Sequence, residues 1–559
     1  MKSEKIDPQP FQRTARAAFH RTAISLAALI SLMMAGFVPS VSGQSTATVT
    51  GIVMDQSGAV VPGADVQLID EKSGDLRRTV SNGEGYFTIS AVQAKTYKLR
   101  VELTGFQAWE RLGIEVHPGD KINISDIQLQ AGAQNQTITV SATSNEIISV
   151  DSGEKSALIT AKQIQNLSII GRDATELLKI LPGLVPMGSG IENRAGFTGE
   201  VIGINGNGAG GKQSAIGNYS ANGGREDAID IVSDGAHVSD PGCNCASPVS
   251  PNVEMIQEFK VQGASFSAEN SKGPVVVSSV SKSGGSAFHG EGYYYGRRAA
   301  LNANDWLANR SGLPRPESNY SFPGFNIGGP VLIPGTSFNK DRNKLFFFFG
   351  AEWVRQGIDT GTKRAIVPTP AMINGDFTDA AYINSLNKGG VQNVPNANGF
   401  ANGGLTDPAL IDKGAQTLMK LYPAPNRDPK TSDGFNWVTN EVVQQNMNQQ
   451  LARVDYSISD YTKLYVRYNR QRELQPFNFG LWWNSSDVPT PSRVIAPNAS
   501  DSISTNLTKV FNPTLTNEFT FGYTFVDFPN QFEDPTKMSR KAIGYTHPGL
   551  FKNGLDQIP

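Results

Sequence analysis

Apolar and polar residues alternate along much of the second half of the chain. Between Asn517 and Phe528, the alternating aromatic residues are Phe519, Phe521, Tyr523 and Phe525. Residues 452–458 and 464–469 repeat this pattern. A period of two predicts strands with one apolar and one polar face. Both a membrane β-barrel, with its apolar face outward, and a soluble sandwich, with its apolar face inward, have such strands.

The N-terminal third predicts a different β structure. Between Thr46 and Leu129, about seven short apolar or alternating runs are separated by the turn clusters DQSG, EKSGD and SNGEG. Many short strands with regular turn signals are typical of a small β-sandwich.

Residues 153–285 mix the two kinds of periodicity. Helices are predicted at 160–166 and 172–181, and strands at EVIGING, AIDIVSDG, MIQEFKVQ and VVVSSVSK. A loop rich in Gly and Asn contains GNGAGGK at 206–212, which is close to a phosphate-binding motif. No helix is predicted to follow it, as phosphate binding would require, so we interpret it as a plain loop.

The first 43 residues indicate export. Five basic residues precede the apolar run 23–38, and small residues follow at 41–43. This order is typical of a signal peptide, here cleaved near Gly43–Gln44, although an uncleaved membrane anchor shows a similar pattern. Export, the frequent Tyr and Phe residues and the long loops between strands favour the barrel over the soluble sandwich. LFFFFGAEW, residues 345–353, does not alternate, and we interpret it as a strand crossing an aromatic girdle.

Composition excludes two classes of protein. With 49 basic and 51 acidic residues, the net charge is -2, so we expect no nucleic-acid partner. Mean hydropathy is -0.29, and no run of about 20 apolar residues occurs beyond the N-terminus, which excludes a helical membrane protein.

Cys243 and Cys245 are the two cysteines of the chain. In an exported protein they can close a small strained disulfide ring or remain free. A zinc site needs about four ligands, and the five histidines show no ligand spacing. We therefore expect a disulfide or a free pair, no metal and no cofactor.

Specific motifs resemble two known families. GIVMDQSGAVVPGADVQL, SNGEGYFTIS and YKLRVELTGFQ resemble the carboxypeptidase regulatory-like domain, a β-sandwich. The zinc-peptidase residues do not accompany it, so the resemblance implies an accessory domain without catalytic residues, of a fold loosely associated with carbohydrate binding.

From residue 164 onward the chain resembles the TonB-dependent outer-membrane receptors. IQNLSIIGRDATELLKILPG and AIDIVSDGAHVSD, with a turn at Asp234–Gly235, resemble their plug domain. FNIGGPVLIPG, NKLFFFFGAEWVRQ, VPTPAMINGDFTD and RVDYSISDYTKLYVRYNR resemble the barrel of the Oar-like subgroup. The first barrel strand would be EGYYYG, with Tyr293–Tyr295 at an aromatic girdle.

The segment between sandwich and plug is a candidate contact for a partner protein. It consists of Thr137, Ile138, Thr139, Val140, Ser141 and Ala142. An exposed extended run can add as a strand to the sheet of a partner, although the same pattern fits a plain linker. The family resemblance favours contact with a TonB-type energy-coupling protein.

Together these observations predict a mainly β protein of five parts. They are a signal peptide (1–43), the regulatory-like sandwich (44–131), a linker with the TonB contact (132–152), an α+β plug (153–285) and part of an outer-membrane barrel (286–559). The resemblance implies uptake of an extracellular ligand, such as a siderophore or oligosaccharide, with the barrel in outer-membrane lipid and the sandwich in the periplasm. The alternatives are a structural or adhesion protein that presents surface loops, and a carbohydrate-binding module.

The barrel is expected to be incomplete. Residues 286–559 number 274, whereas a plugged barrel of about 22 strands requires roughly 600 residues. We therefore predict about eight to ten strands and a chain that is a fragment of a longer protein.

Overall fold

The computed structural model describes 46–132, 137–141, 153–167, 172, 177–178, 180–186, 219–224, 229–239, 252–264, 275–386, 393–396, 399–402, 404–478, 480–481, 484–485, 488, 491–512, 515–527, 529–545 and 547. The predicted signal peptide, the Gly-rich motif at 206–212, Ala142, Cys243 and Cys245 lie outside these residues, as does the strand EVIGING. Among the described residues, no helix is long and apolar enough to cross a membrane.

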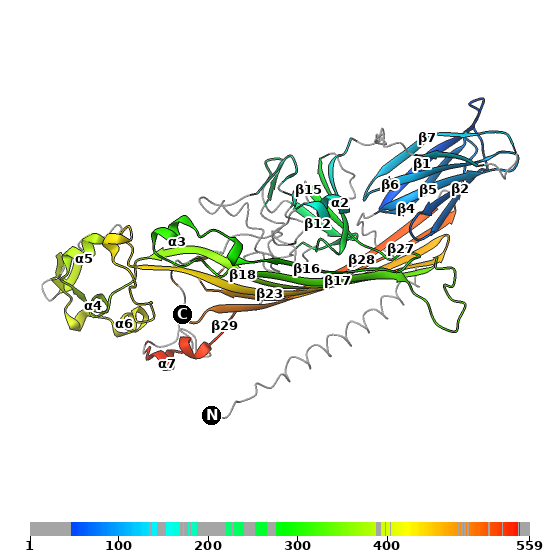
Figure 1. The fold of residues 1–559 in the computed structure, drawn as a ribbon. Coiled ribbons are helices and arrows are strands. Elements are labelled where there is room, and N and C mark those ends of the chain that lie inside the picture. The colour runs from blue at the N-terminus through cyan, green and yellow to red at the C-terminus, as the bar shows by residue number, and fades with distance from the viewer. Residues whose placement is uncertain are drawn as a thin grey trace. The chain divides into compact units, whose positions relative to one another are not determined.

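Residues 46–141 form the sandwich, with two sheets that enclose one core (Figure 1). One sheet has the order β4 (Tyr86–Gln93), β1 (Thr46–Asp55), β7 (Lys121–Leu129). The other has the order β3 (Leu76–Val80), β2 (Asp65–Asp70), β5 (Lys95–Glu102), β6 (Ala108–Val116), β8 (Thr137–Ser141). Buried positions alternate along β2 and β5, as expected for strands that cover a core on one face. The seven predicted strands thus correspond to β1–β7.

Gly51 shows why the sandwich core tolerates little change. A Cβ atom there would lie 2.5 Å from the carbonyl oxygen of Ile124 and 2.6 Å from the ring of Phe87. Glycine therefore permits the aromatic ring to pack directly against the backbone of β1.

Residues 153–281 form a unit that we call the plug. Its mixed sheet has the order β13 (Ala236–His237), β12 (Ile229–Ser233), β15 (Val275–Ser281), β14 (Ile256–Ala264), β9 (Lys155–Thr160). Helix α2 (Ala161–Asn166) begins at Thr160, whose hydroxyl accepts from the Gln163 amide in a capping box. Strands β10 (Leu184–Pro186) and β11 (Tyr219–Ala221) form a small second sheet. Of the helix predicted at 172–181, the structure describes only Arg172, a 3-10 turn at Leu177, Leu178 and Ile180, and a bend at Leu181.

Residues 289–532 contribute an antiparallel sheet of eight strands that we call the wall. Its order is β16 (His289–Arg297), β17 (Tyr320–Pro330), β18 (Leu345–Ala365), β23 (Trp437–Ser459), β24 (Thr462–Phe477), β27 (Val494–Asn512), β28 (Leu515–Asp527), with β29 (Gln531–Phe532) paired to β27. Within the described residues β16 and β28 are not paired to each other, so the sheet has two edges. The strand number agrees with the eight to ten predicted.

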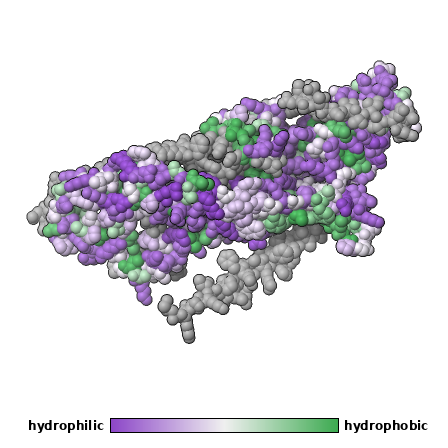
Figure 2. All heavy atoms as spheres, viewed as in Figure 1, coloured by the Kyte–Doolittle hydropathy of each residue, from purple (hydrophilic) through white to green (hydrophobic). Residues whose placement is uncertain are grey.

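The wall settles the choice between barrel and soluble sandwich. From Asn498 onward the buried side chains of β27 are polar: Asn498, Ser500, Ser502, Ser504, Asn506 and Thr508. The apolar side chains of Tyr523 and Phe525 in β28 are 47% and 42% exposed. A soluble sheet would bury its apolar face, whereas a membrane barrel presents it to lipid. In Figure 2 a band of pale and green residues crosses the lower middle of the molecule, where Figure 1 shows the wall.

The aromatic run of β18 follows the same geometry. Phe346 and Phe348 are buried, while Phe347 and Phe349 are half-buried on the other face. Phe348 packs against Met255 of the plug and Leu451 of β23. The run does not alternate in sequence because both of its faces are apolar, one toward the plug and one outward.

Long connections join the wall strands at one end. They contain α3 (Trp306–Arg310), α4 (Pro370–Ile373), α5 (Ala380–Ser385), α6 (Lys413–Met419), β19 (Asp376–Phe377), β20 (Asn393–Asn396), β21 (Gly399–Asn402), β22 (Gly404–Leu405), β25 (Gly480–Leu481) and β26 (Asn484–Ser485). Helix α7 (Arg540–Ile543) follows β29. Short 3-10 turns are η3 (Ala299–Leu301), η4 (Pro408–Leu410), η5 (Pro429–Thr431) and η6 (Pro535–Met538).

Candidate functional site between plug and wall

The β12–β13 turn of the plug places one carboxylate against the wall. Asp234 and Gly235 occupy the turn with φ of 46° and 76°, as the predicted D-G turn requires. The Asp234 side chain is buried, and its Oδ1 accepts from the backbone N–H of Ser281 at 2.9 Å and from its hydroxyl at 3.0 Å. The turn is therefore held in place by β15 of the same plug sheet.

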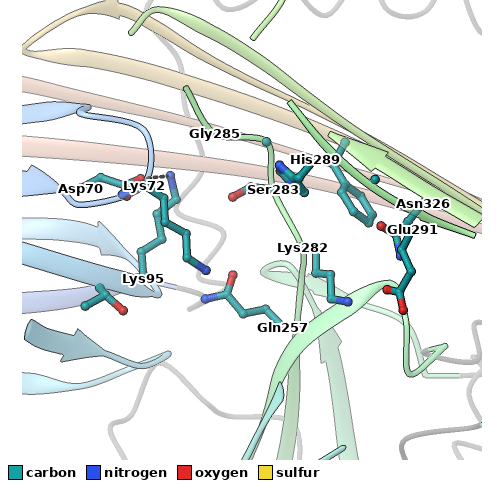
Figure 3. A pocket seen from close by; sticks show the side chains of 14 residues that line it. Asp70, Lys72, Lys95, Gln257, Lys282, Ser283, Gly285, His289, Glu291 and Asn326 are labelled. Carbon is teal, nitrogen blue, oxygen red and sulfur yellow. Dashed lines mark hydrogen bonds and ion pairs between the residues drawn. The ribbon is translucent and has the colours of Figure 1, made fainter. Parts of the chain in front are cut away.

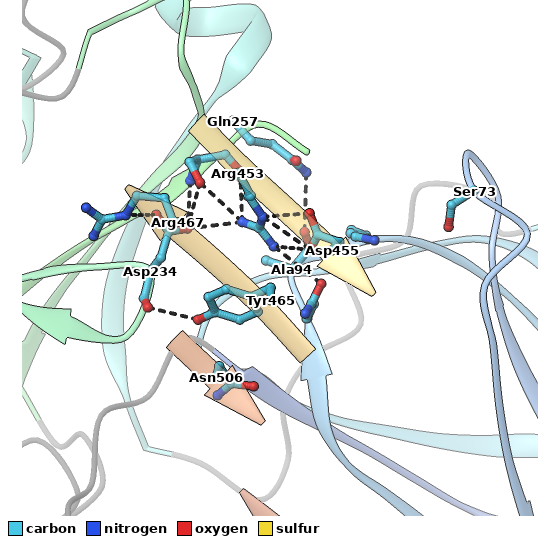
Figure 4. Close-up of polar contacts among 12 residues, drawn as sticks. Ser73, Ala94, Asp234, Gln257, Arg453, Asp455, Tyr465, Arg467 and Asn506 are labelled. Carbon is cyan, nitrogen blue, oxygen red and sulfur yellow. Dashed lines mark hydrogen bonds and ion pairs between the residues drawn. The ribbon is translucent and has the colours of Figure 1, made fainter. Parts of the chain in front are cut away.

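Two wall arginines meet this carboxylate (Figure 4). Arg453 of β23 and Arg467 of β24 each lie 3.1 Å from an oxygen of Asp234. Both guanidinium groups are almost fully buried, with side-chain exposures of 4% and 0%. Asp455 pairs with Arg453 at 2.8 Å, so the cluster contains two cations and two anions. Buried ions of this kind are tolerated only when paired and hydrogen-bonded.

Hydrogen bonds to the turn backbone complete this Asp234 cluster. The carbonyl oxygen of Asp234 accepts from the Tyr465 hydroxyl at 2.8 Å and from the Ser504 hydroxyl at 2.5 Å. Arg467 donates to the carbonyl oxygen of Ser233 at 2.9 Å. Three neighbouring wall strands thus bind one plug turn.

A second cluster surrounds Arg172 of the plug. Its guanidinium lies 3.0 Å from Glu254 of the plug and 3.1 Å from Glu352 of β18. It also lies over the ring of Tyr295, with Cζ 3.8 Å from the ring centroid. Asn252 donates to the second oxygen of Glu352 at 2.7 Å. This Arg172 cluster therefore joins the plug to β16 and β18 by charge and by a cation–π contact.

The position predicted for Tyr293–Tyr295 is wrong for two of the three residues. Tyr293 and Tyr295 lie against Arg172, and the Tyr295 hydroxyl donates to Glu254 at 3.1 Å. Tyr294 points away from this cluster and is 56% exposed, while Tyr295, although it lies under the guanidinium, is 43% exposed. Alternation along a strand places its first and third tyrosines on one face, which here is the plug side.

The sandwich contacts the plug through the turn between β6 and β7. His117 Nδ1 lies 2.8 Å from Glu258 Oε2. Lys260 Nζ donates to the carbonyl oxygen of Pro118 at 2.7 Å and to Asp120 at 2.9 Å. The pKa of His117 is raised above its ordinary value. Burial alone would lower this pKa, but the hydrogen bond to Glu258 and the charges of the nearby carboxylates outweigh the effect of burial. The contact is thus charge-assisted on both sides.

We expect the His117 contact to weaken in alkaline solution. The pKa of His117 is raised above its ordinary value of about 6.5. The ion pair with Glu258 therefore contributes its full stabilisation below about pH 6.5, and this stabilisation is lost as the pH rises through the raised pKa. Because the pair is partly solvated, amide exchange in β14 should quicken by about threefold to tenfold between acid and alkaline buffer, after correction for intrinsic exchange. The variant His117→Asn should lose this difference; an unchanged pH dependence in the variant would contradict the assignment.

A cavity of about 400 Å³ lies where sandwich, plug and wall meet (Figure 3). Its ionisable lining residues are Asp70, Lys72, Lys95, Lys282, His289 and Glu291. Lys95 pairs with Asp70 at 2.8 Å, and burial lowers the pKa of Lys282. Among the described residues no group of three His, Cys, Asp or Glu could hold a metal. Three lysines and two carboxylates among the lining residues make this cavity polar, with a small excess of positive charge.

The candidate TonB contact lies at the edge of the sandwich. Thr137–Ser141 form β8, which pairs in parallel with β6 from Ala108↔Thr137 to Leu112↔Ser141. The segment is therefore extended, as predicted from its sequence. Its pairing with the sandwich was not predicted, because a run of five residues gives no signal for which strand it joins.

Two domain models match parts of the chain on either side of the plug. Residues 280–558 match the model of the outer membrane beta barrel domain, and residues 48–130 match that of the carboxypeptidase regulatory-like domain. The chain is thus an outer-membrane β-barrel protein. More specifically, it belongs to those that carry an N-terminal carboxypeptidase regulatory-like domain. These matches confirm the resemblance that the sequence motifs showed to the regulatory-like domain and to an outer-membrane barrel. They also confirm the mainly β fold class and the outer-membrane location.

Outer-membrane receptors and transporters are among the solved structures that match the chain. The transporter YddB from Escherichia coli is 10% identical, with a TM-score of 0.41, over 68% of this chain and 40% of that one. A variant of the ferric enterobactin receptor PfeA from Pseudomonas aeruginosa is 11% identical (TM-score 0.31; 68% and 46%). The siderophore receptor PirA from Acinetobacter baumannii is 13% identical, with a TM-score of 0.28, over 68% of this chain and 49% of that one. The chain spans less than half of each protein. No curated protein matches it.

Proposed function

We propose that the protein is a TonB-dependent outer-membrane receptor that takes up an extracellular ligand past its plug. The observation that carries the proposal is the polar inner face of the wall, occupied by a separate unit through the Asp234 and Arg172 clusters. A purely structural barrel needs no such unit, whereas a transporter must close its lumen until a ligand arrives. The ligand class is a siderophore, an oligosaccharide or a similar small molecule.

The covalent path from the partner to the plug is short. In this proposal a TonB-type protein pairs with Thr137–Ala142 and pulls. Fourteen residues after Ser141 the chain enters β9 at Lys155, so the pull reaches the plug directly. Strand β9 is the edge of the plug sheet and pairs with β14. An edge strand has one neighbour to lose, which makes β9 the first element to be displaced.

The proposed reaction is movement without bond chemistry. The buried ions pair with each other and with backbone groups, as the contacts of Asp234 and Arg172 illustrate. No residue is therefore proposed as catalytic, and no cofactor is proposed.

Proline within the contact segment tests this function. The variant Val140→Pro removes a backbone N–H from the segment, so it should lower the affinity for the periplasmic domain of a TonB-type protein by about tenfold or more. Binding of the full chain in detergent is measured by calorimetry. Asn145→Pro, in the same linker but outside the six residues, serves as the matched control and should bind as the unaltered chain does.

Two results would contradict the proposal. Equal binding by Val140→Pro and the unaltered chain would show that another surface makes the contact. No binding by the unaltered chain would favour the alternative of an outer-membrane adhesion or structural protein, whose barrel presents the long connections that contain α4, α5 and α6.

A further inference from the structure

We propose that the regulatory-like domain is part of the docking site for the energy-coupling protein, because it holds the contact segment as the edge strand of its own sheet. This inference rests on the proposed function and deepens it. The partner strand would add to the free edge of β8, extending the sheet β3-β2-β5-β6-β8 by one strand.

The register of β8 carries this proposal. All five residues of β8 pair in sequence with Ala108–Leu112 of β6, without a break. Within the described residues β8 has β6 as its one neighbour in the sheet, so its other edge is unpaired. An unpaired edge presents a row of backbone donors and acceptors, which is what strand addition uses.

Docking on β6 also gives a thermodynamic advantage. A strand that is free in a linker must lose conformational entropy when a partner orders it. A strand already held in the extended conformation has lost that entropy beforehand, so the partner binds more tightly. Thr137, Ile138, Thr139 and Val140 are β-branched, which suits an extended backbone.

The sandwich is in turn anchored to the plug at the end of β6. Strand β6 ends at Val116, and the next residues, His117–Asp120, make the contacts with Glu258 and Lys260 of β14. One strand thus connects the docking edge to the plug sheet. A partner on β8 would therefore act on the plug through this contact as well as through the linker.

Two arrangements are distinguishable by experiment. If the partner adds to β8 in place, the pairing of β6 with β8 persists in the complex. If β6 merely covers the segment, the partner must first remove β8 from it. A covalent bond between the strands leaves the first arrangement intact and prevents the second.

The test joins the register pair Leu112 and Ser141. The variant Leu112→Cys/Ser141→Cys is made with Cys243→Ser and Cys245→Ser, oxidised, and compared with its reduced form for binding to the TonB periplasmic domain. We expect the disulfide to form and the oxidised protein to bind with a Kd within about threefold of the reduced one. Each single-cysteine variant serves as a control for the substitutions.

Three results would overturn the inference. Absence of cross-linking would show that β8 does not pair with β6. A tenfold or greater loss of binding in the oxidised form alone would show that β8 must leave the sandwich, although the proposed function would survive. Binding that is insensitive to Val140→Pro would remove both the proposed function and this inference.

Discussion

Replacing Asp234 by Ala is expected to release the plug turn from the wall. The variant leaves Arg453 and Arg467 buried with one carboxylate fewer, and Arg453 alone retains an ion pair with Asp455. Removing one member of a buried ion pair costs about 3–5 kcal/mol, because the remaining charge stays uncompensated. Amide exchange in β12 and β15 of the reconstituted protein measures this loss as a lower free energy of local opening.

A half-buried ion pair of the same wall supplies the control. Arg472 and Asp501 lie 2.7 Å apart with side-chain exposures of 35% and 23%, so Asp501→Ala should change stability by only about 0–1 kcal/mol. The double variant Asp234→Ala/Arg467→Met should recover part of the lost stability, because it also removes the guanidinium that the single variant leaves buried without a carboxylate. Equal effects of the two alanine variants would refute the role assigned to Asp234.

Replacing Arg172 by Met is expected to loosen the other side of the plug by a similar amount. The change leaves the buried carboxylates of Glu254 and Glu352 without their shared cation, and it removes the cation–π contact with Tyr295. We expect a loss of about 3–5 kcal/mol in the local stability of β14, again measured by amide exchange. The local stability of β14 in Arg172→Lys should lie between that of the unaltered chain and that of Arg172→Met. The lysine keeps the positive charge, but its ammonium group cannot bind two carboxylates from two sides as a guanidinium does.

The matched control for this variant is Arg493→Met. Arg493 pairs with Glu533, and both side chains are more than 40% exposed, so its loss should be near zero. If the amides of β14 exchanged as slowly in Arg172→Met as in the unaltered chain, the Arg172 cluster would not hold the plug.

The sequence predicted the wall and the sandwich because their signal is periodic. Alternation in 517–528 and the turn clusters between residues 46 and 129 follow from local chemistry alone. The sequence also placed a turn at Asp234–Gly235, where positive φ favours these residue types. These features needed no knowledge of distant contacts.

The candidate site was missed because its residues are far apart in the chain. Asp234 and Arg453 are separated by 219 positions, and Arg172 and Glu352 by 180. One signal was available: Arg453 and Asp455, like Arg467 and Asn469, are polar at alternate positions with an apolar or aromatic residue between them, which indicates a polar inner face. The same reasoning would have turned Tyr293 and Tyr295 toward the plug.

The central claim is that the plug is a separable unit that a pull on β8 can extract. A handle on Val140→Cys, in a Cys243→Ser/Cys245→Ser background, allows the chain to be stretched from that point in a supported bilayer. Full extraction up to Ser281 should release about 500 Å of chain before the wall is loaded. Ala236 and Gly522 allow a lock: a Cβ atom at Gly522 would lie 2.7 Å from that of Ala236, so a separation of the two strands by about 1 Å gives the Cβ–Cβ distance of about 3.8 Å that a disulfide spans.

The decisive measurement compares the released length with and without a disulfide at Ala236→Cys/Gly522→Cys, formed before the handle is attached. With the lock closed, the first extension should end at about 330 Å, because the chain between Val140 and Ala236 is all that remains free. Reduction should restore the longer value. An extension that begins with the wall strands, or one whose length does not depend on the lock, would contradict the account of a movable plug held inside the wall.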